Sequence, residues 1–251
     1  MNKLITLSIS AIIVFTCCFY AIPVKHKAKT DSKGFAVVEL FTSEGCSSCP
    51  AADEAVAQLA KDYPDHVYIL GYHVDYWNYI GWKDVYSSSA FTERQRKYGE
   101  HFSLSSVYTP QIVVNGQKEF VGSNRSQLKS SVTAAIGSTS ADDIKLTLTK
   151  ENGTTLQVGY EVNAKAATQL NIALVQLNAT TEVRRGENKG KSLHHINIVR
   201  ALKIIQVNRD AKAEVAITVP ADLSLQNMEL VAFLQDKKDL QITAATAEKL
   251  Q

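Results

Sequence analysis

The segment from residue 35 to residue 62 constrains the fold most, because an apolar strand leads through a Cys-x-x-Cys pair into a helix. Residues 35–41 are apolar except for Glu39, which is typical of a buried strand. Cys46 and Cys49 follow, and Pro50 opens a stretch with apolar residues on one helical face. The free N–H groups and positive dipole end of a helix start stabilise a thiolate, and such thiols have a pKa of roughly 3.5–7. This order favours a redox-active pair.

Metal binding is the first alternative for a Cys-x-x-Cys pair. Structural zinc usually takes four protein ligands, and the sequence contains no second Cys-x-x-Cys pair. The remaining cysteines, Cys17 and Cys18, lie in an apolar N-terminal run and cannot join the site. A copper site made of Cys46, Cys49 and His73 stays open, because thiolates and imidazole suit copper. A disulfide that only staples a loop also stays open.

A second motif, Thr109-Pro110, stands before a predicted hairpin. Residues 111–114 read as a strand, Asn115-Gly116 is a strong hairpin signal, and residues 119–122 supply the return strand. Proline is tolerated at a strand entrance, where its missing N–H is not needed. Most X–Pro bonds are trans, so the residues alone do not predict a cis bond here.

The order of strand, Cys-x-x-Cys, helix, strand, helix, Thr-Pro, hairpin and helix resembles the thioredoxin fold. The resemblance implies that Pro110 is cis and lies beside the cysteines, with Thr109 offering backbone groups to a substrate strand. Ser47-Ser48 stands where typical thioredoxins have Gly-Pro, which leaves the direction of redox poise open. More narrowly, the chain resembles a bacterial secreted family with a thioredoxin-like domain, the domain of unknown function 1223, at residues 39–50, 73–77, 81–84, 108–110, 182–190 and 197–200.

Composition sets broad limits on function. The 251 residues are enough for one large domain or two ordinary ones, and 45% hydrophobic with 21% charged residues describes a soluble globular protein. A net charge of +2 gives no indication of nucleic-acid binding, and the sequence has no glycine-rich phosphate loop. No cofactor is expected.

The N-terminus, residues 1–24, is expected to be a signal peptide, an uncleaved membrane anchor or a lipoprotein leader. Residues 4–22 are apolar or small and carry no charge. Three lysines between residues 25 and 29 favour a cytoplasmic position for that side of the segment. The resemblance to secreted proteins nevertheless favours the periplasm or cell envelope, with residues 25–34 as a tether.

The spacing of apolar residues changes from helical to period two near residue 141. Ile144, Leu146 and Leu148 alternate with polar residues, and Asn152-Gly153 turns the chain. We therefore predict a thioredoxin-like domain at residues 35–140, with a central mixed sheet flanked by helices. A smaller all-β sandwich follows at 141–251, with further strands at 170–177, 214–219 and 229–235.

Three further features each allow two interpretations. Glu39 in an apolar strand is expected to form a structural salt bridge, with acceptance of the Cys49 proton when the mixed disulfide resolves as the alternative. Aromatic residues either line a substrate groove or pack an insertion onto the domain: Tyr76, Trp77, Tyr79 and Trp82. A basic stretch is expected to be a loop that docks the two domains rather than an acid-binding site: Arg184, Arg185, Lys189, Lys191 and Arg200, with His194 and His195 inside it.

Together these features predict a thiol–disulfide oxidoreductase that acts on exported proteins. Cys46 would be the attacking thiolate, Cys49 would resolve the mixed disulfide, and Thr109 with Pro110 would hold the substrate backbone. Electrons would pass through the thiols of clients and of a redox partner protein. The rivals are a copper-binding or copper-delivery protein and a non-catalytic envelope binding module.

Overall fold

The computed structural model describes residues 34–250 apart from 141, 152–153 and 222. The predicted leader, the predicted tether up to residue 33 and the predicted Asn152-Gly153 turn lie outside the described residues. Within the described part of the chain, no helix is both long and apolar enough to cross a membrane.

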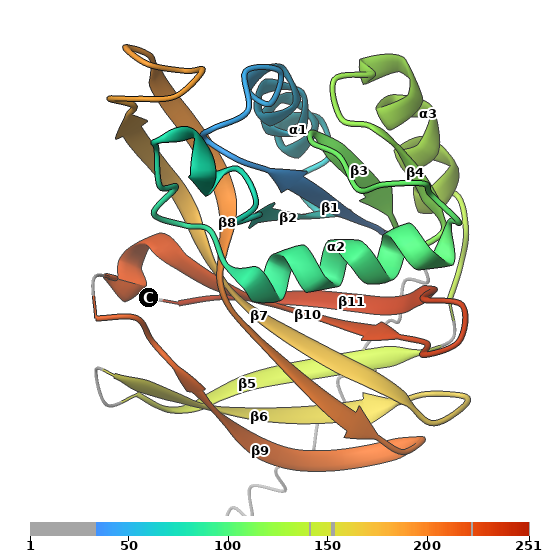
Figure 1. Ribbon diagram of the computed structural model, residues 1–251. Helices are drawn as coiled ribbons and strands as arrows, with labels where there is room; N and C mark the ends of the chain where they lie inside the picture. Colours follow the sequence, from blue (N-terminus) through green and yellow to red (C-terminus); the bar gives the residue numbers. More distant parts are fainter. Residues whose placement is uncertain (1–33, 141, 152–153, 222, 251) are drawn as a thin grey trace, which may run out of the picture. The chain divides into compact units, whose positions relative to one another are not determined.

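An eight-stranded mixed sheet carries the fold, in the order β11-β10-β7-β8-β2-β1-β3-β4 (Figure 1). β1 is parallel to β2, and β3 is antiparallel to both β1 and β4. The strands are β1 (Ala36–Thr42), β2 (Val67–His73), β3 (Gln111–Val114), β4 (Lys118–Val121), β7 (Thr168–Glu182), β8 (Ser192–Val207), β10 (Met228–Gln235) and β11 (Ile242–Lys249).

Helices cover both faces of the sheet around β1. Val38 and Leu40 pack with α1 (Pro50–Asp62) and α3 (Arg125–Ile136). Val37 and Phe41 pack on the other face with α2 (Ser89–His101). A strand buried on both faces reads as a continuous apolar run, which explains why all seven residues of β1 are buried. This is the mixed sheet with flanking helices that the sequence predicts.

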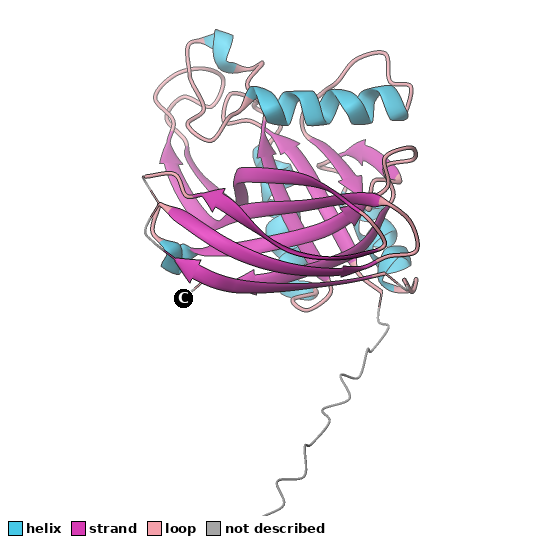
Figure 2. Cartoon of the chain, turned by 90° about the horizontal axis from the view of Figure 1, so that it is seen from below, coloured by secondary structure: helices cyan, strands magenta, loops and turns pink. Residues whose placement is uncertain are grey.

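A second, three-stranded antiparallel sheet is formed by β5 (Asp143–Glu151), β6 (Thr155–Asn163) and β9 (Asp210–Thr218), in the order β5-β6-β9. Seen from below, this sheet faces the viewer (Figure 2). Every second residue of β6, from Leu156 to Val162, is buried against apolar residues of β7 and β10. The period-two pattern therefore correctly predicts antiparallel strands in two packed layers.

The layer that packs against β5, β6 and β9 differs from the prediction of a separate sandwich. β7, β8, β10 and β11 belong to the same sheet as β1, because β8 pairs in parallel with β2 at Gly71 and Ile198. Glycine permits this junction, since a Cβ on Gly71 would lie only 3.3 Å from the Asn197 carbonyl oxygen. The described residues form one compact unit, and a domain boundary at residue 140 stays a prediction.

The described residues also form two short 3-10 helices. The first, η1 (Asn78–Ile80), lies in the aromatic insertion after β2. The second, η2 (Leu225–Asn227), precedes β10. The insertion matters for the site, because it packs against the cysteine loop.

Candidate functional site: a disulfide at the start of α1

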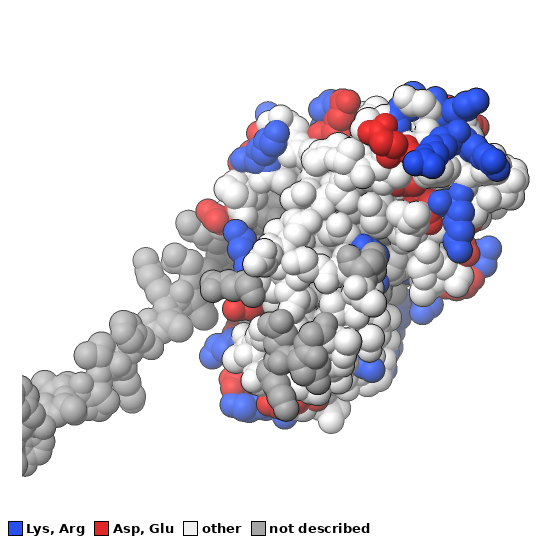
Figure 3. Space-filling view, turned by 90° about the vertical axis from the view of Figure 1, so that its left-hand side faces the viewer, with Lys and Arg blue, Asp and Glu red and all other residues white. Residues whose placement is uncertain are grey.

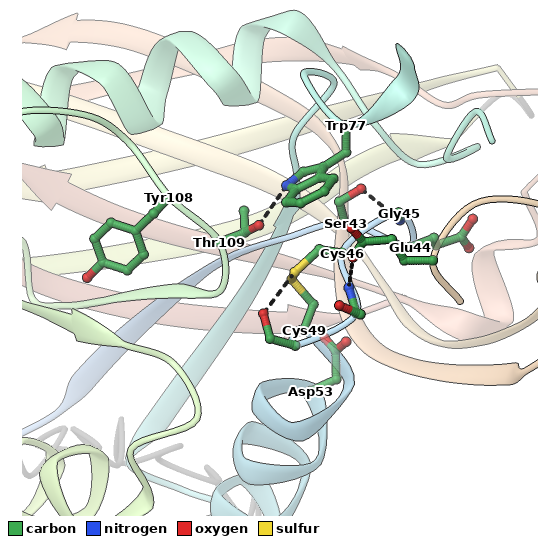
Figure 4. The surroundings of a disulfide bond; sticks show 12 residues. Ser43, Glu44, Gly45, Cys46, Cys49, Asp53, Trp77, Tyr108 and Thr109 are labelled. Atoms are coloured by element: carbon green, nitrogen blue, oxygen red, sulfur yellow. Dashed lines mark hydrogen bonds between the residues drawn. A yellow bond between two sulfur atoms is a disulfide. The ribbon is translucent and has the colours of Figure 1, made fainter. Parts of the chain in front are cut away.

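Cys46 and Cys49 form a disulfide, with their Cα atoms 5.4 Å apart, in the loop between β1 and α1 (Figure 4). Cys49 is the N-cap residue of α1, and its carbonyl oxygen accepts hydrogen bonds from Ala52 N and Asp53 N at 2.9 and 3.1 Å. The Ser48 hydroxyl lies 3.4 Å from Cys46 Sγ and is the donor, because a disulfide sulfur carries no proton. The strand–disulfide–helix order follows the prediction.

Both disulfide cysteines are buried. Cys46 is 1% exposed and Cys49 is 0% exposed, whereas Ser47 and Ser48 between them are exposed. A difference of one per cent in exposure is too small to assign the roles of the two sulfurs. Cys46 as attacking thiolate and Cys49 as resolving thiol stay predictions.

The Thr109–Pro110 peptide bond is cis, as the resemblance implied. Thr109 and Trp77 both lie in the surroundings of the disulfide, and Trp77 Nε1 donates to Thr109 Oγ1 at 2.7 Å (Figure 4). Gln95 Nε2 donates to the Tyr108 carbonyl oxygen at 2.6 Å and so ties this loop to α2. Substrate binding by Thr109 and Pro110 stays a prediction.

Part of the aromatic insertion packs onto the cysteine loop. A Cβ on Gly45 would lie 3.1 Å from both Trp77 Cβ and Ile80 Cδ1, so a larger residue would push these side chains away by a few tenths of an ångström. Trp82 Nε1 donates to Glu44 Oε2 at 2.7 Å. Tyr79 is 82% exposed and Val85 is 65% exposed, so these two large apolar side chains of the insertion face solvent.

Glu39 forms the structural salt bridge. Arg94 binds both of its carboxylate oxygens, with Nε–Oε2 at 2.5 Å and Nη2–Oε1 at 3.0 Å, and Tyr98 donates to Oε1. Glu39 is fully buried on the α2 side of β1, and Gln235 of β10 completes the network through Arg94 and Tyr98. Proton transfer between Glu39 and Cys49 stays a prediction.

The loop between β7 and β8, residues 183–191, packs on the cysteine loop. Asn188 is fully buried, and its Nδ2 donates to the carbonyl oxygens of Glu44 at 2.8 Å and Cys46 at 2.9 Å. Glu187 Oε2 accepts from Ser47 N at 3.0 Å. The docking predicted for this segment is present, but an amide and an acid make these contacts.

Among the basic side chains of this segment, Lys191 Nζ donates to Asn188 Oδ1, and the Arg200 guanidinium lies over the ring of Tyr86 in the insertion after β2. Arg184, Arg185, Lys189 and Lys191 are exposed, and Lys and Arg side chains gather at the corresponding end of the molecule (Figure 3). Residues 192–200, expected to be loop, are instead the first part of β8. Leu193 and His195 are buried while Ser192 and His194 are exposed, as expected for a strand with one buried face. The polar and basic residues of this segment suggested a loop instead.

His73 is held at the end of β2 by Asp84, with Nδ1 and Oδ2 2.7 Å apart and both side chains 1% exposed. Burial alone raises the pKa of Asp84, but the His73 ring and the N–H groups of Glu44 and Tyr86 hold that pKa below its usual range. Among the described residues, no three His, Cys, Asp or Glu side chains are arranged to hold a metal ion. The copper alternative stays a prediction.

Sequence reasoning missed three residues of this region. Asp84 lies in a motif quoted for the family resemblance, and Asn188 lies between Gly186 and Gly190, which both have positive φ. His195 is buried on β8 beside α1, where its Nε2 lies 3.5 Å from Glu44 Oε1 and its Nδ1 lies 3.7 Å from Asp53 Oδ2. Of these three residues, only Asn188 had a local signal in the sequence: the flanking glycines, Gly186 and Gly190, indicate a structured loop.

The β1–disulfide–α1 unit, the cis-proline loop and the flanking helices define a protein of the thioredoxin superfamily. A thioredoxin from Methanocaldococcus jannaschii is 34% identical over 85 residues, which cover 34% of this chain and 76% of that protein. The chain belongs to the family described as "Protein of unknown function (DUF1223)", whose sequence profile matches residues 37–235.

The whole described fold also has a counterpart among solved structures. A crystal structure of a protein from Agrobacterium tumefaciens is similar, with a TM-score of 0.65 and 26% sequence identity. The match covers 86% of this chain and 93% of that chain. The likeness therefore extends beyond the thioredoxin-like part into the β-rich half.

Proposed function

We propose that the protein is a thiol–disulfide oxidoreductase that exchanges disulfides with exported proteins through Cys46 and Cys49. The observation that carries this proposal is the disulfide at the N-cap of α1, in the surroundings of the loop that contains the cis Thr109–Pro110 bond. A 34% identical thioredoxin supports the same class of chemistry.

In the oxidising direction, a client thiolate attacks Cys46 Sγ and the Cys46–Cys49 bond breaks. Cys49 leaves as a thiolate, at the N-cap of α1 where N–H groups and the helix dipole favour negative charge. A second client thiolate then attacks the client sulfur of the mixed disulfide, which releases Cys46. The client loses two electrons and gains a disulfide, and the protein becomes a dithiol that a redox partner reoxidises. The reducing direction is the reverse.

The buried sulfurs require that this loop opens before a client reacts. Cys46 is 1% exposed, and the exposed Ser47 and Ser48 are the part of the loop that a client meets first. Thr109 and Pro110 would then hold the client backbone beside the disulfide. The cell envelope is the proposed location, supported by the apolar run at residues 4–22, which would be a signal or a membrane attachment.

Burial of both sulfurs favours one second candidate, a non-catalytic binding module whose disulfide staples the loop. Structural disulfides are generally buried and inert, whereas catalytic thiols are partly accessible. The exposed Tyr79 beside the loop would then belong to a binding surface.

Trapping separates the two candidates. Cys49→Ser should accumulate mixed disulfides between Cys46 and client proteins, because no resolving thiol remains, whereas Cys46→Ser should accumulate none and lose exchange activity. Ser48→Ala is the matched control and should exchange disulfides without trapping. A chain whose Cys49→Ser variant forms no covalent adducts in the envelope fraction is not an exchanger with these roles.

A further inference from the structure

The geometry points to a buried charge cluster of His195, Glu44 and Asp53 that sets the stability of a thiolate in the Cys46–Cys49 loop. His195 is the positioning residue, and the β-rich half of the chain supplies it. This inference rests on the proposed function and assigns to β8 a part in the chemistry of α1.

His195 lies between two acids that flank the cysteine pair. Its Nε2 is 3.5 Å from Glu44 Oε1, and its Nδ1 is 3.7 Å from Asp53 Oδ2. His195 is 2% exposed, the side chain of Glu44 is 0% exposed and that of Asp53 is 12% exposed. Glu44 stands two residues before Cys46, and Asp53 lies in the first turn of α1, four residues after Cys49.

Several buried polar atoms of the cluster lack a hydrogen-bond partner. Within the described residues, neither ring nitrogen of His195 has a hydrogen-bond partner, and Glu44 Oε1 has none. Buried polar groups are nearly always hydrogen-bonded, so three such atoms in one place need an explanation. A site that holds a charge and adjusts when the neighbouring disulfide is reduced supplies that explanation.

The surroundings favour a protonated ring. Burial lowers the pKa of His195, but the attraction of Asp53 and Glu44 outweighs it and raises that pKa to about 10. The His73 ring packs edge-on at 4.9 Å and is itself bound by Asp84. The Tyr86 ring packs edge-to-face with His195 at a centroid distance of 5.9 Å, and the Arg200 guanidinium lies over the Tyr86 ring.

Hydrogen bonds hold Glu44 in place at the start of the cysteine loop. Trp82 Nε1 holds Glu44 Oε2 at 2.7 Å, and Glu44 N donates to Asp84 Oδ2 at 2.9 Å. Charges held this close to the loop act on a thiolate directly: the imidazolium attracts it and the two carboxylates repel it.

This arrangement changes the proton balance of the redox step. When a client dithiol reduces the disulfide, two electrons enter and the two sulfurs can take up two protons. An imidazolium nearby lets one sulfur remain a thiolate, so that one proton fewer is taken up for the same two electrons. The imidazolium thereby offsets part of the repulsion from the two carboxylates, so the protein is a stronger oxidant than it would be with a neutral residue at position 195.

Charge variants of the full chain test the inference by the sign of their effects. The thiolate absorbance of the reduced protein and its reduction potential are measured at one pH. His195→Gln should lower the thiolate fraction several-fold, because the variant removes one positive charge from the cluster that flanks the cysteine pair. It should also lower the reduction potential.

Asp53→Asn and Glu44→Gln remove a negative charge and should raise the thiolate fraction and the potential. A structural role predicts instead that all three variants shift these quantities in the same direction. His194→Gln is the matched control, because His194 is the exposed neighbour on the same strand and should leave both quantities unchanged.

Two outcomes overturn the inference: His195→Gln shifting the thiolate fraction in the same direction as Asp53→Asn, or neither variant shifting it. If His195→Gln does not fold, Asp53→Asn alone decides: a raised thiolate fraction supports the inference, and a lowered or unchanged one overturns it. Failure of the proposed function is distinguishable, because a wild-type chain that exchanges no disulfides would still show these opposite shifts in its reduced form.

Discussion

Replacement of Asn188 by alanine should destabilise the oxidised protein far more than any neighbouring change in the same loop. The Asn188 amide donates to two carbonyl oxygens of the cysteine loop, at 2.8 and 2.9 Å, and accepts from Lys191 Nζ at 2.9 Å. Each hydrogen bond is worth about 0.5–1.5 kcal/mol net, and a buried group left unpaired costs about 1–3 kcal/mol. We expect a loss of about 2–4 kcal/mol in the free energy of unfolding.

Denaturant unfolding of the oxidised full chain measures this loss through the transition midpoint at unchanged slope. Lys189→Ala is the matched control: Lys189 is exposed next to Asn188, and a surface change of this kind stays within about 0.5 kcal/mol. Asn188→Ala should also speed reduction of the disulfide by a small thiol, because the cysteine loop loses its anchor. A loss below about 1 kcal/mol, or an equal loss in Lys189→Ala, would refute the idea that Asn188 anchors the loop.

Two further predictions concern buried charges. Glu39→Gln should cost about 3–5 kcal/mol in unfolding free energy, because it leaves Arg94 buried without its counter-ion, whereas Glu93→Gln in an exposed pair should cost almost nothing; equal losses in denaturant melts would contradict this. The pKa of His195 is raised from 6.5 to about 10, so the stability that the protonated ring contributes is complete below pH 6.5 and is lost as the pH rises through about 10. In the oxidised protein, where the cysteines do not titrate, His195→Gln should flatten this decline in melting temperature, and an unchanged pH profile would contradict the assignment.

The local part of the site could be predicted from the sequence, because its signals lie within a few residues of one another. The strand before Cys46, the helix after Cys49 and the hairpin at Asn115-Gly116 each follow from neighbouring residue types. The cis form of Thr109–Pro110 followed only from the family resemblance, since proline alone does not predict it.

The long-range part could not be predicted in the same way. Period-two spacing predicts a half-buried strand but says nothing about which edge that strand joins, so the pairing of β8 with β2 was missed. Gly71 marks the junction, yet a lone glycine in a strand has several explanations. The buried positions of Asn188 and His195 depend on contacts with residues more than 100 positions away, and their polarity suggested exposure instead.

The central claim is that Cys46 and Cys49 are a redox-active pair, and their reduction potential tests it most directly. Equilibration of the full chain with redox buffers, followed by quantification of the two thiols, gives this potential. The proposed function predicts a reversible two-electron equilibrium in the range of known exchange proteins, roughly −120 to −270 mV. A potential below about −300 mV, typical of structural disulfides, would contradict the claim and favour a binding module with a stapled loop.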